Sequence, residues 1–336
     1  MHSSPPFRWG IISTGHISGK FAEALKTVPG AELYAVASRS AERAEAFARE
    51  HGMQKAYGSY RALADDPEVD VIYIGTPHVF HLENAVMYLR AGKAVLCEKA
   101  LTINAREAEE MIRVAREEKV FLMEAMITPH VPLIKKIVQW VREGRIGEVR
   151  MVRASRCIRR EFSREARQLN PLLGGGALLD LGVYPIAFAS LIFGKEPVEA
   201  MGTAHIGEQG SDEQGAALLQ YNDGALADIT FALRTETVND AFIHGTDGYI
   251  HIDEIFAVPH RVTLYDKERN VAESIEEKVR GQGLAYEAEE VMRCLHEGLT
   301  ESPFMPLDES LRIMRIMDRI RKPWGMRYPN DDFGIL

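Results

Sequence analysis

The feature that most constrains the fold is the regular alternation of short apolar runs with amphipathic segments between residues 7 and 124. The expected strands are Phe7–Ser13, Ala31–Ser38, Val69–Gly75, Ala94–Cys97 and Val120–Glu124. The expected helices between them are Ile17–Leu25, Ala41–Glu50, His78–Ala91 and a segment from Asn104 through Glu118. Strands that alternate with helices predict an α/β fold, with a parallel sheet and helices on both of its faces.

The pattern changes after Glu124, where we place the boundary between two domains, residues 1–124 and 125–336. Strand-like segments follow one another from Glu199 to about Tyr265, with turn signals at Asn222–Gly224 and Thr246–Gly248. Successive hairpins predict a largely antiparallel sheet. The other elements expected in this region are a strand at Gly147–Ile158 and helices at Leu133–Arg142, within Ala177–Phe193, at Tyr286–Glu297 and at Leu307–Arg321.

Length and charge exclude several classes of protein. The 336 residues have room for about two domains, and the net charge is −9 without a run of lysine and arginine. Neither duplex nucleic acid nor an anionic membrane is therefore expected as the main partner. Asp180 and Pro185 interrupt the most apolar window, Ala177–Phe193, which predicts a buried helix instead of a membrane span.

The cysteines and the N-terminal segment indicate a reducing compartment. Cys97, Cys157 and Cys294 are far apart and odd in number, which predicts neither a disulfide framework nor a zinc site. No metal is expected. The segment Met1–Pro6 lacks the basic and apolar parts of a signal peptide. The expected location is the cytoplasm.

The first turn of the chain predicts a dinucleotide site. It reads Gly10-Ile-Ile-Ser13-Thr14-Gly15-His16-Ile17-Ser18, so Gly15 is kept while serines stand in neighbouring glycine positions of G-x-G-x-x-G. The turn follows the first strand, opens the first helix and begins a βαβ unit of suitable length. The amide donors and partial positive charge of a helix N-terminus suit a pyrophosphate. A glycine turn without a special use is the alternative.

The end of the second strand favours NADP over NAD. An NAD site usually carries an acidic side chain there, which would repel a 2′-phosphate. This chain instead has Ser38 and Arg39, with Arg43 one turn further and no acid. A serine hydroxyl can donate a hydrogen bond, and arginine can form a charge-assisted pair with phosphate. The expected cofactor is NADP, with NAD as the alternative.

A second candidate site lies in Gly92–Leu101. The apolar run Ala94–Cys97 ends in two opposite charges, Glu98 and Lys99. Ligands of open α/β sheets bind beyond the carboxyl ends of the strands. A lysine delivered there loses hydration and titrates nearer neutrality, as proton transfer requires. The alternative is a surface ion pair where the strand leaves the core.

The third informative stretch is Gly174–Tyr184. Asp180 and Tyr184 are four residues apart, so they would share one face of a helix, and Gly182 leaves room for a ligand or for close packing. An ordinary core helix is the alternative. Four arginines that precede this stretch could meet an anionic or polyhydroxylated substrate, although a solvated strand face is the more frequent explanation. They are Arg153, Arg156, Arg159 and Arg160.

Taken in order, these motifs resemble the glucose–fructose oxidoreductase/inositol dehydrogenase (Gfo/Idh/MocA) family over nearly the whole chain. Tyr184 stands where many members have histidine, so the chain is most similar to the dimeric dihydrodiol dehydrogenase/NADP D-xylose dehydrogenase branch. The residues that carry the resemblance are the first glycine turn, Gly75-Thr76-Pro77-His78 with His81, Cys97-Glu98-Lys99, Met123-Glu124-Ala125 and Gly-Gly-Gly-x-x-x-Asp180-x-Gly182-x-Tyr184.

The resemblance implies an N-terminal Rossmann domain and a C-terminal α/β domain whose large, open, mostly antiparallel sheet often mediates assembly, so a homodimer or homotetramer is expected. It also implies roles for individual residues. Lys99 would contact the nicotinamide ribose and the substrate, Tyr184 would donate or accept the proton, and Asp180 would orient the substrate or the lysine. The positions expected to bind the cofactor are Gly10, Ser13, Thr14, Gly15, His16, Ile17, Ser38, Arg39, Arg43, Gly75, Thr76, Pro77, His78, His81, Glu98 and Lys99.

Two departures from the family pattern stand out. Members usually have proline after the lysine, often with a cis peptide bond, whereas Ala100 follows Lys99 here. A non-proline cis bond costs about 2.5–4 kcal/mol, which favours a trans bond with a slightly re-aimed lysine, but the sequence leaves open whether the bond is cis. The segment Ile127–Pro132 differs from the arginine and aromatic sequence common in the dihydrodiol branch, which leaves the identity of the substrate open.

The leading interpretation is an NADP-dependent oxidoreductase that transfers a hydride to or from a CH–OH/C=O carbon of a sugar or cyclic diol. A desolvated Lys99 would favour the phenolate of Tyr184, which removal of a hydroxyl proton requires. One alternative is a redox-neutral NAD(P)-dependent glycosidase. The other is a nucleotide-binding regulator without catalysis, against which the joint presence of Lys99, Asp180 and Tyr184 argues.

Overall fold

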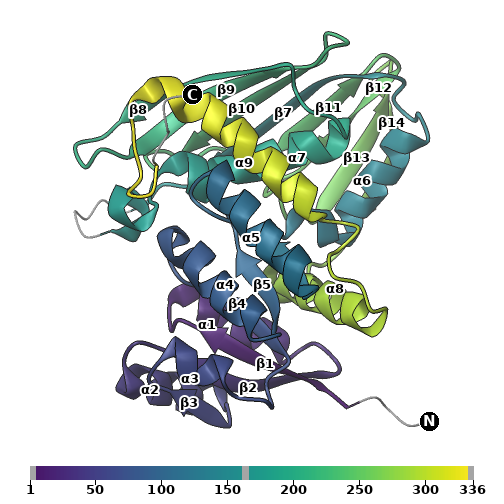
Figure 1. Cartoon of the computed structure of the whole chain (residues 1–336). Coiled ribbons are helices and arrows are strands. Elements are labelled where there is room, and N and C mark those ends of the chain that lie inside the picture. The colour runs from purple at the N-terminus through teal and green to yellow at the C-terminus, as the bar shows by residue number, and fades with distance from the viewer. Residues whose placement is uncertain (1–4, 161–165, 332–336) are drawn as a thin grey trace. The chain divides into compact units, whose positions relative to one another are not determined.

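The computed structural model describes residues 5–160 and 166–331 (Figure 1). The first four residues of the segment Met1–Pro6 lie outside the described residues, as do residues 161–165, which follow Arg160. The chain forms two compact units. The first comprises Met1–Thr102, Arg106–Met126 and Arg280–Ser310, and the second comprises Ile103–Ala105, Ile127–Val279 and Leu311–Leu336.

The sheet of the first unit is parallel, as the alternating pattern predicts, and its strand order is β3-β2-β1-β4-β5-β6. This is the doubly wound order of a Rossmann fold. Every residue of β4 and β5 is buried, because helices cover both faces of such a sheet. The strands are β1 (Phe7–Ile12), β2 (Ala31–Ala37), β3 (Lys55–Tyr57), β4 (Val71–Ile74), β5 (Ala94–Glu98) and β6 (Leu122–Ala125).

The helices of this unit begin close to the residues expected from sequence. Ser40 caps the second helix by accepting a hydrogen bond from the Arg43 amide at 3.3 Å. The helical elements are α1 (His16–Leu25), α2 (Ala41–His51), α3 (Tyr60–Ala64), the 3₁₀ turn η1 (His78–Phe80), α4 (His81–Arg90), α5 (Ala105–Glu118), the 3₁₀ turn η6 (Gly281–Gly283) and α8 (Leu284–His296). The last helix of the chain, α9 (Leu307–Arg321), is divided between the two units.

The carboxyl ends of the central strands lie in register. Ile12 pairs with Ile74, Ile74 with Cys97, and Cys97 with Glu124. The residues that follow β1, β4 and β5 therefore emerge at the same edge of the sheet. The strand order changes direction between β1 and β4, which is the switch point where ligands of open α/β sheets bind.

The helix α8 belongs to the first unit although it follows the second sheet in the chain. It packs against α1, the ring of Phe7 contacts His296 edge to face, and the Leu122 amide donates to the Thr300 carbonyl at 3.1 Å. The two consecutive domains expected from sequence, residues 1–124 and 125–336, differ from these units by the return of Arg280–Ser310. The apolar faces of α1 and α8 account for this return, because each is buried by the other.

The sheet of the second unit is mostly antiparallel, as the hairpin signals predict, and its strand order is β14-β13-β12-β11-β7-β10-β9-β8. Among the described strands of this second sheet, only β7 and β10 form a parallel pair. The turns at residues 222–224 and 246–248 connect β9 to β10 and β11 to β12. The strands are β7 (Val149–Cys157), β8 (Glu199–Ile206), β9 (Asp212–Gln220), β10 (Leu226–Ala232), β11 (Ala241–Gly245), β12 (Gly248–Ile252), β13 (Arg261–Asp266) and β14 (Val271–Glu276).

One face of this sheet is apolar and is covered by a helix. Val152, Ile229 and Ile243 are fully buried on three neighbouring strands, and α7 packs against β7 and β10 (Figure 1). The apolar window expected to be a buried helix is a π-helical turn, η5 (Leu178–Gly182), that continues into α7 (Val183–Phe193). No helix in the described part of the chain could span a membrane. The remaining elements are η2 (Thr128–His130), α6 (Pro132–Arg142), η3 (Arg167–Leu169), η4 (Pro171–Leu173) and η7 (Lys322–Trp324).

Candidate functional site

The turn after β1 presents the start of α1 to a ligand. Gly15 is the N-cap of α1 and makes no side-chain cap, so the first helix amides are not satisfied by a capping side chain. Ser13 has a φ of 83°, a left-handed conformation that favours glycine, so the turn keeps the path of the glycine motif despite the serine. A Cβ at Gly75 would lie 2.5 Å from the Ser18 hydroxyl. This narrow, glycine-dependent approach beside an uncapped helix fits a pyrophosphate.

The residues after β2 fit a phosphorylated ribose. Ser38 is buried, and its hydroxyl accepts a hydrogen bond from the Ser40 amide at 3.3 Å. Arg39 and Arg43 are exposed, and the Arg39 guanidinium lies 5.8 Å from the centre of the Phe80 ring. An exposed guanidinium in place of an acid can pair with a 2′-phosphate.

The other residues predicted to bind the cofactor near this turn differ in what surrounds them. A Cβ at Gly10, inside β1, would lie 2.8 Å from the Ile72 side chain, so this glycine is required for packing within the sheet. His16 and Thr14 line a cavity of about 570 Å³, and Ile17 lies within van der Waals reach of a Cβ at Gly75.

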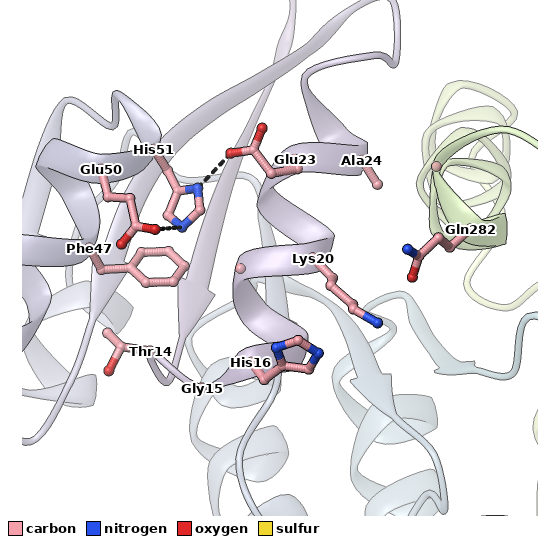
Figure 2. Close-up of a pocket in the computed structure, with 12 residues that line it drawn as sticks. Thr14, Gly15, His16, Lys20, Glu23, Ala24, Phe47, Glu50, His51 and Gln282 are labelled. Atoms are coloured by element: carbon pink, nitrogen blue, oxygen red, sulfur yellow. Dashed lines mark hydrogen bonds and ion pairs between the residues drawn. The ribbon is translucent and has the colours of Figure 1, made fainter. Parts of the chain in front are cut away.

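This cavity lies between α1, α2 and the turn at Gly281–Gln282 (Figure 2). Figure 2 shows His51 between two carboxylates, and its Nδ1 is 2.7 Å from Glu23 Oε1. Lys20 and His16 project from the same side of α1. The cavity therefore extends from the turn after β1 along α1.

Lys99 lies in a turn directly beyond β5, and the Lys99–Ala100 peptide bond is cis. The sequence left the isomer of this bond open. Glu98 is buried. It accepts a short hydrogen bond from the Tyr73 hydroxyl and another from the Lys99 amide at 3.2 Å.

Two predicted histidines hold the backbone of this turn. His78 Nε2 is 3.1 Å from the Lys99 carbonyl oxygen. His81 is fully buried, with Nδ1 3.1 Å from the carbonyl oxygens of both Ala100 and Leu101 and Nε2 2.8 Å from that of Thr76. Carbonyl oxygens only accept hydrogen bonds, so a ring nitrogen of His81 that carries hydrogen donates to them.

The β4–α4 connection supplies the rest of this support. The Thr76 hydroxyl accepts a hydrogen bond from the Asn84 side chain at 3.2 Å, and Pro77 starts the turn η1 in an extended conformation. His78 and His81 thus act on the Lys99 turn through its carbonyl oxygens, and His81 also contacts the Thr76 carbonyl oxygen.

A group of buried carboxyls lies behind the same turn. Glu124 accepts a hydrogen bond from the Leu101 amide at 2.9 Å, and burial raises its pKa to about 7. Glu287 of α8 is fully buried and neither of its oxygens has a hydrogen-bond partner. Burial, with repulsion from Glu98 and Glu124, raises the pKa of Glu287 well above its ordinary value. Burial of this unpartnered carboxyl therefore disfavours its charged form.

In the second unit, the glycine cluster Gly174–Gly176 brings the backbone close to neighbouring segments of the chain. A Cβ at Gly175 would lie 2.6 Å from the Arg167 carbonyl oxygen, and one at Gly176 would lie 2.1 Å from Asp212 Oδ1. Asp212 is fully buried and accepts a hydrogen bond from the Leu178 amide at 2.6 Å, which fixes the start of η5. Burial raises the pKa of Asp212 to about 6.

Asp180 and Tyr184 lie on the segment that follows this cluster, Asp180 within the π-helical turn and Tyr184 in the first turn of α7. Asp180 is buried and Tyr184 is partly exposed. Gly182 between them is needed for close packing, because a Cβ there would lie 3.0 Å from both Leu178 and Phe231. π-Helical turns are rare and are frequent at functional sites.

Arg156 on β7 joins this pair. Its guanidinium carbon is 5.8 Å from the centre of the Tyr184 ring, and its Nε is buried without a hydrogen-bond partner. Burial lowers the pKa of Arg156, while the nearby charges of Tyr184 and Asp180 oppose that change. The other arginines of the group lie elsewhere: Arg153 is exposed and pairs with Asp228 at 3.6 Å, and Arg159 and Arg160 are exposed.

The predicted residues thus form two clusters, one in each unit. Lys99, Glu98, His78 and His81 come together in the first unit, and Asp180 and Tyr184 in the second. Sequence reasoning assigned no role to Tyr73, Glu124 and Glu287, which are buried with Glu98, or to Arg156 as distinct from its neighbours. The available signal for Arg156 was its position two residues from Ala154 and four from Val152, on the apolar face of β7. Among the described residues, no group of three or more His, Cys, Asp or Glu side chains could hold a metal ion.

The chain matches two family models. Residues 7–126 match "Oxidoreductase family, NAD-binding Rossmann fold", and residues 134–251 match "GFO/IDH/MocA C-terminal domain". The chain is 38% identical over 331 residues to a trans-1,2-dihydrobenzene-1,2-diol dehydrogenase of Oryctolagus cuniculus, covering 96% of this chain and 99% of that protein. The identity to the Homo sapiens protein of the same name is 37%, over 96% and 98% of the two chains.

A solved structure is similar over the same extent. The 3-ketoreductase from Actinomadura kijaniata in complex with NADP and TDP-benzene has a TM-score of 0.84 and 30% identity, over 94% of this chain and 97% of that chain. The similarity covers the Rossmann unit and the mostly antiparallel sheet alike. The cofactor prediction of a nicotinamide dinucleotide is confirmed by the match to an NAD-binding Rossmann fold. The chain therefore belongs to the Gfo/Idh/MocA family of NAD(P)-dependent dehydrogenases and reductases.

Proposed function

We propose that this protein is an NADP-dependent oxidoreductase that acts on a CH–OH/C=O carbon of a sugar or cyclic diol. Its relatives are named for a dihydrodiol and a ketoreductase activity, which supports this class of substrate. The observation that carries the proposal is the Lys99 turn. It lies at the carboxyl end of β5, where His78 and His81 contact its carbonyl oxygens and Glu124 accepts a hydrogen bond from its Leu101 amide.

Each catalytic residue has a separate task in this proposal. The bound nicotinamide supplies or accepts the hydride. Tyr184 exchanges a proton with the substrate hydroxyl or carbonyl oxygen, because an alcohol carbon releases hydride only when its hydroxyl proton leaves as well. Lys99 supplies positive charge that favours the phenolate and donates hydrogen bonds to hydroxyl groups. Asp180 accepts hydrogen bonds that orient the substrate or the lysine.

The preference for NADP over NAD belongs to the proposal as well. The exposed Arg39 guanidinium, the buried hydroxyl of Ser38 and the lack of an acid after β2 all favour a 2′-phosphate.

A substrate panel tests the reaction class. Aldopyranoses, cyclic diols and dicarbonyls are incubated with NADP or NADPH, and the absorbance of NADPH is followed. We expect net cofactor turnover with at least one of these classes. A sugar-dependent reaction without net change in NADPH would indicate the redox-neutral glycosidase. Cofactor binding without any turnover would indicate a regulator.

The variant Lys99→Met tests the catalytic assignment. We expect kcat to fall by about 10²–10⁴-fold, the usual contribution of a positioned proton-transfer group, while the affinity for NADPH stays measurable by fluorescence titration. Lys267→Met is a matched control, because Lys267 is exposed and lies 3.8 Å from Glu268 in the turn after β13. Full turnover by Lys99→Met with bound NADPH would refute the role of this lysine.

Cytoplasmic location and assembly into a homodimer or homotetramer remain predictions. The three cysteines are free and buried, which supports a reducing compartment. Sedimentation velocity of the purified protein measures its oligomeric state directly.

A further inference from the structure

The arginines of β7 occupy opposite faces of the sheet. Side chains alternate along a strand, so Arg156 shares a face with Val152 and Ala154, which are both buried. Its partner in the neighbouring strand β10 is Phe231, which is buried as well. Arg153 is on the opposite face, where 58% of its side chain is exposed. Arg156 is therefore a cation on the apolar, helix-covered face.

The protein leaves this cation incompletely satisfied. No carboxylate within residues 5–160 and 166–331 forms an ion pair with Arg156, and its Nε has no acceptor. Asp180 and Tyr184 are near enough to influence its charge, but Arg160 adds a like charge that opposes them. Arg156 is half-buried, and partial burial of an arginine is unfavourable unless its donors are paired. Within the described residues, its Nε–H is therefore available to an acceptor on a ligand.

We infer that Arg156 is a specificity-determining residue that binds an anionic oxygen group, a carboxylate or a phosphate, on the substrate of this enzyme. The inference rests on the proposed function, because it places that group beside Tyr184, the proposed proton-transfer residue. A guanidinium presents Nε–H and Nη–H as a planar fork that matches two oxygens of a carboxylate or phosphate. The substrate class is thus narrowed from sugars and diols in general to sugar acids and sugar phosphates.

Neutral substrates would use Arg156 less well. A sugar hydroxyl can accept one hydrogen bond from the fork, but it brings no charge to balance the buried guanidinium. Hydrogen bonds to charged groups are worth about twice as much as neutral ones. The selectivity for an anionic over a neutral substrate should therefore depend on Arg156 and not on Arg153.

Matched substrates test the inference. The values of kcat/KM are measured for D-glucuronate and D-glucose 6-phosphate against D-glucose, in the wild type and in Arg156→Gln and Arg153→Gln. We expect the wild type to prefer at least one of the anionic sugars, and Arg156→Gln to reduce the ratio of anionic to neutral kcat/KM by about ten- to hundredfold. Whether the carboxylate or the phosphate gives the larger ratio identifies the group. Arg153→Gln should leave the ratio unchanged.

A binding measurement separates this inference from the reaction itself. The melting temperature of the NADP-loaded protein is recorded with D-glucuronate, D-glucose 6-phosphate or D-glucose, and Arg156→Lys shows whether charge alone suffices. Stabilisation by an anionic sugar that is lost in Arg156→Gln would support the inference even if none of the three sugars were turned over. An unchanged anionic-to-neutral ratio in Arg156→Gln, with turnover intact, would overturn it and leave the proposed function standing.

Discussion

The Lys99 turn and the face around Arg156 differ in whether the protein itself supplies hydrogen-bond partners for their polar groups. Around Lys99 the protein itself supplies the partners: His81 contacts three carbonyl oxygens, and Tyr73 donates to Glu98. Around Arg156 the Nε donor is buried without an acceptor. The first region is built to hold one geometry, whereas the second keeps hydrogen-bonding capacity for a ligand. This difference is expected if the chemistry is common to the family and the choice of substrate is particular to this chain.

Replacing His81 with leucine should have the largest effect, because it removes the partner of three carbonyl oxygens in and beside the Lys99 turn. The change leaves the carbonyl oxygens of Thr76, Ala100 and Leu101 buried without their donor. We expect the free energy of unfolding to fall by at least about 3 kcal/mol, measured by urea denaturation, because each lost partner costs about 1–3 kcal/mol. The matched variant is His78→Leu, because the contact of His78 with the Lys99 carbonyl oxygen is only partly buried, and it should cost clearly less. Equal losses would show that the contacts of His81 are not special.

Glu124→Gln tests how the buried carboxyl behind the Lys99 turn makes the free energy of unfolding depend on pH. The pKa of Glu124 is about 7 in the folded protein, against 4.5 for an ordinary glutamate. Between these values the folded state keeps a proton that the unfolded state has lost, so Glu124 contributes stability at low pH that disappears as pH rises through 7. The free energy of unfolding of the wild type, relative to Glu124→Gln, should therefore fall by about 3 kcal/mol from pH 4.5 to pH 8. Parallel pH profiles of the two proteins would rule this out.

Arg39→Asp should have the smallest of these effects. It tests whether Arg39, like Arg156, binds an anionic group of a ligand. Arg39 is exposed, so its loss should leave folding unchanged while a carboxylate repels the 2′-phosphate of NADP. We expect the Kd for NADPH to rise about ten- to hundredfold and the Kd for NADH to change much less, both measured by fluorescence titration. Equal changes for both dinucleotides would remove the basis for a preference for NADP.

Most of the fold could be predicted because its signals are local. The helix Leu307–Arg321 and the turns of the second sheet were predicted correctly, since helical periodicity and Asn-Asp-Gly turns lie in short windows of sequence. The strands β3 and β14 were not predicted. Both are at sheet edges, and β14 has mostly exposed side chains, so neither carries the buried apolar pattern that identifies a strand.

For the candidate site, the sequence indicated which residues to consider but not the contacts that these residues make. The residue types at Lys99, Asp180 and Tyr184 stood out by their place in motifs. The π-helical turn, the cis bond at Lys99 and the partners of His81 depend on segments far apart in the sequence, and no local pattern encodes them. The four arginines of 153–160 show the same limit, because a run of charge does not indicate which member faces the core.

The return of Arg280–Ser310 to the first unit has a consequence for synthesis of the protein. A ribosome makes the parallel sheet first, but the helix that covers α1 emerges only after the entire second sheet has been translated. Until then α1 and Phe7 present apolar surface, which is the kind of exposure that chaperones recognise. A gene truncated at residue 124 should therefore yield an aggregation-prone fragment, whereas a circular permutant that joins α8 to α1 should fold its nucleotide-binding half early.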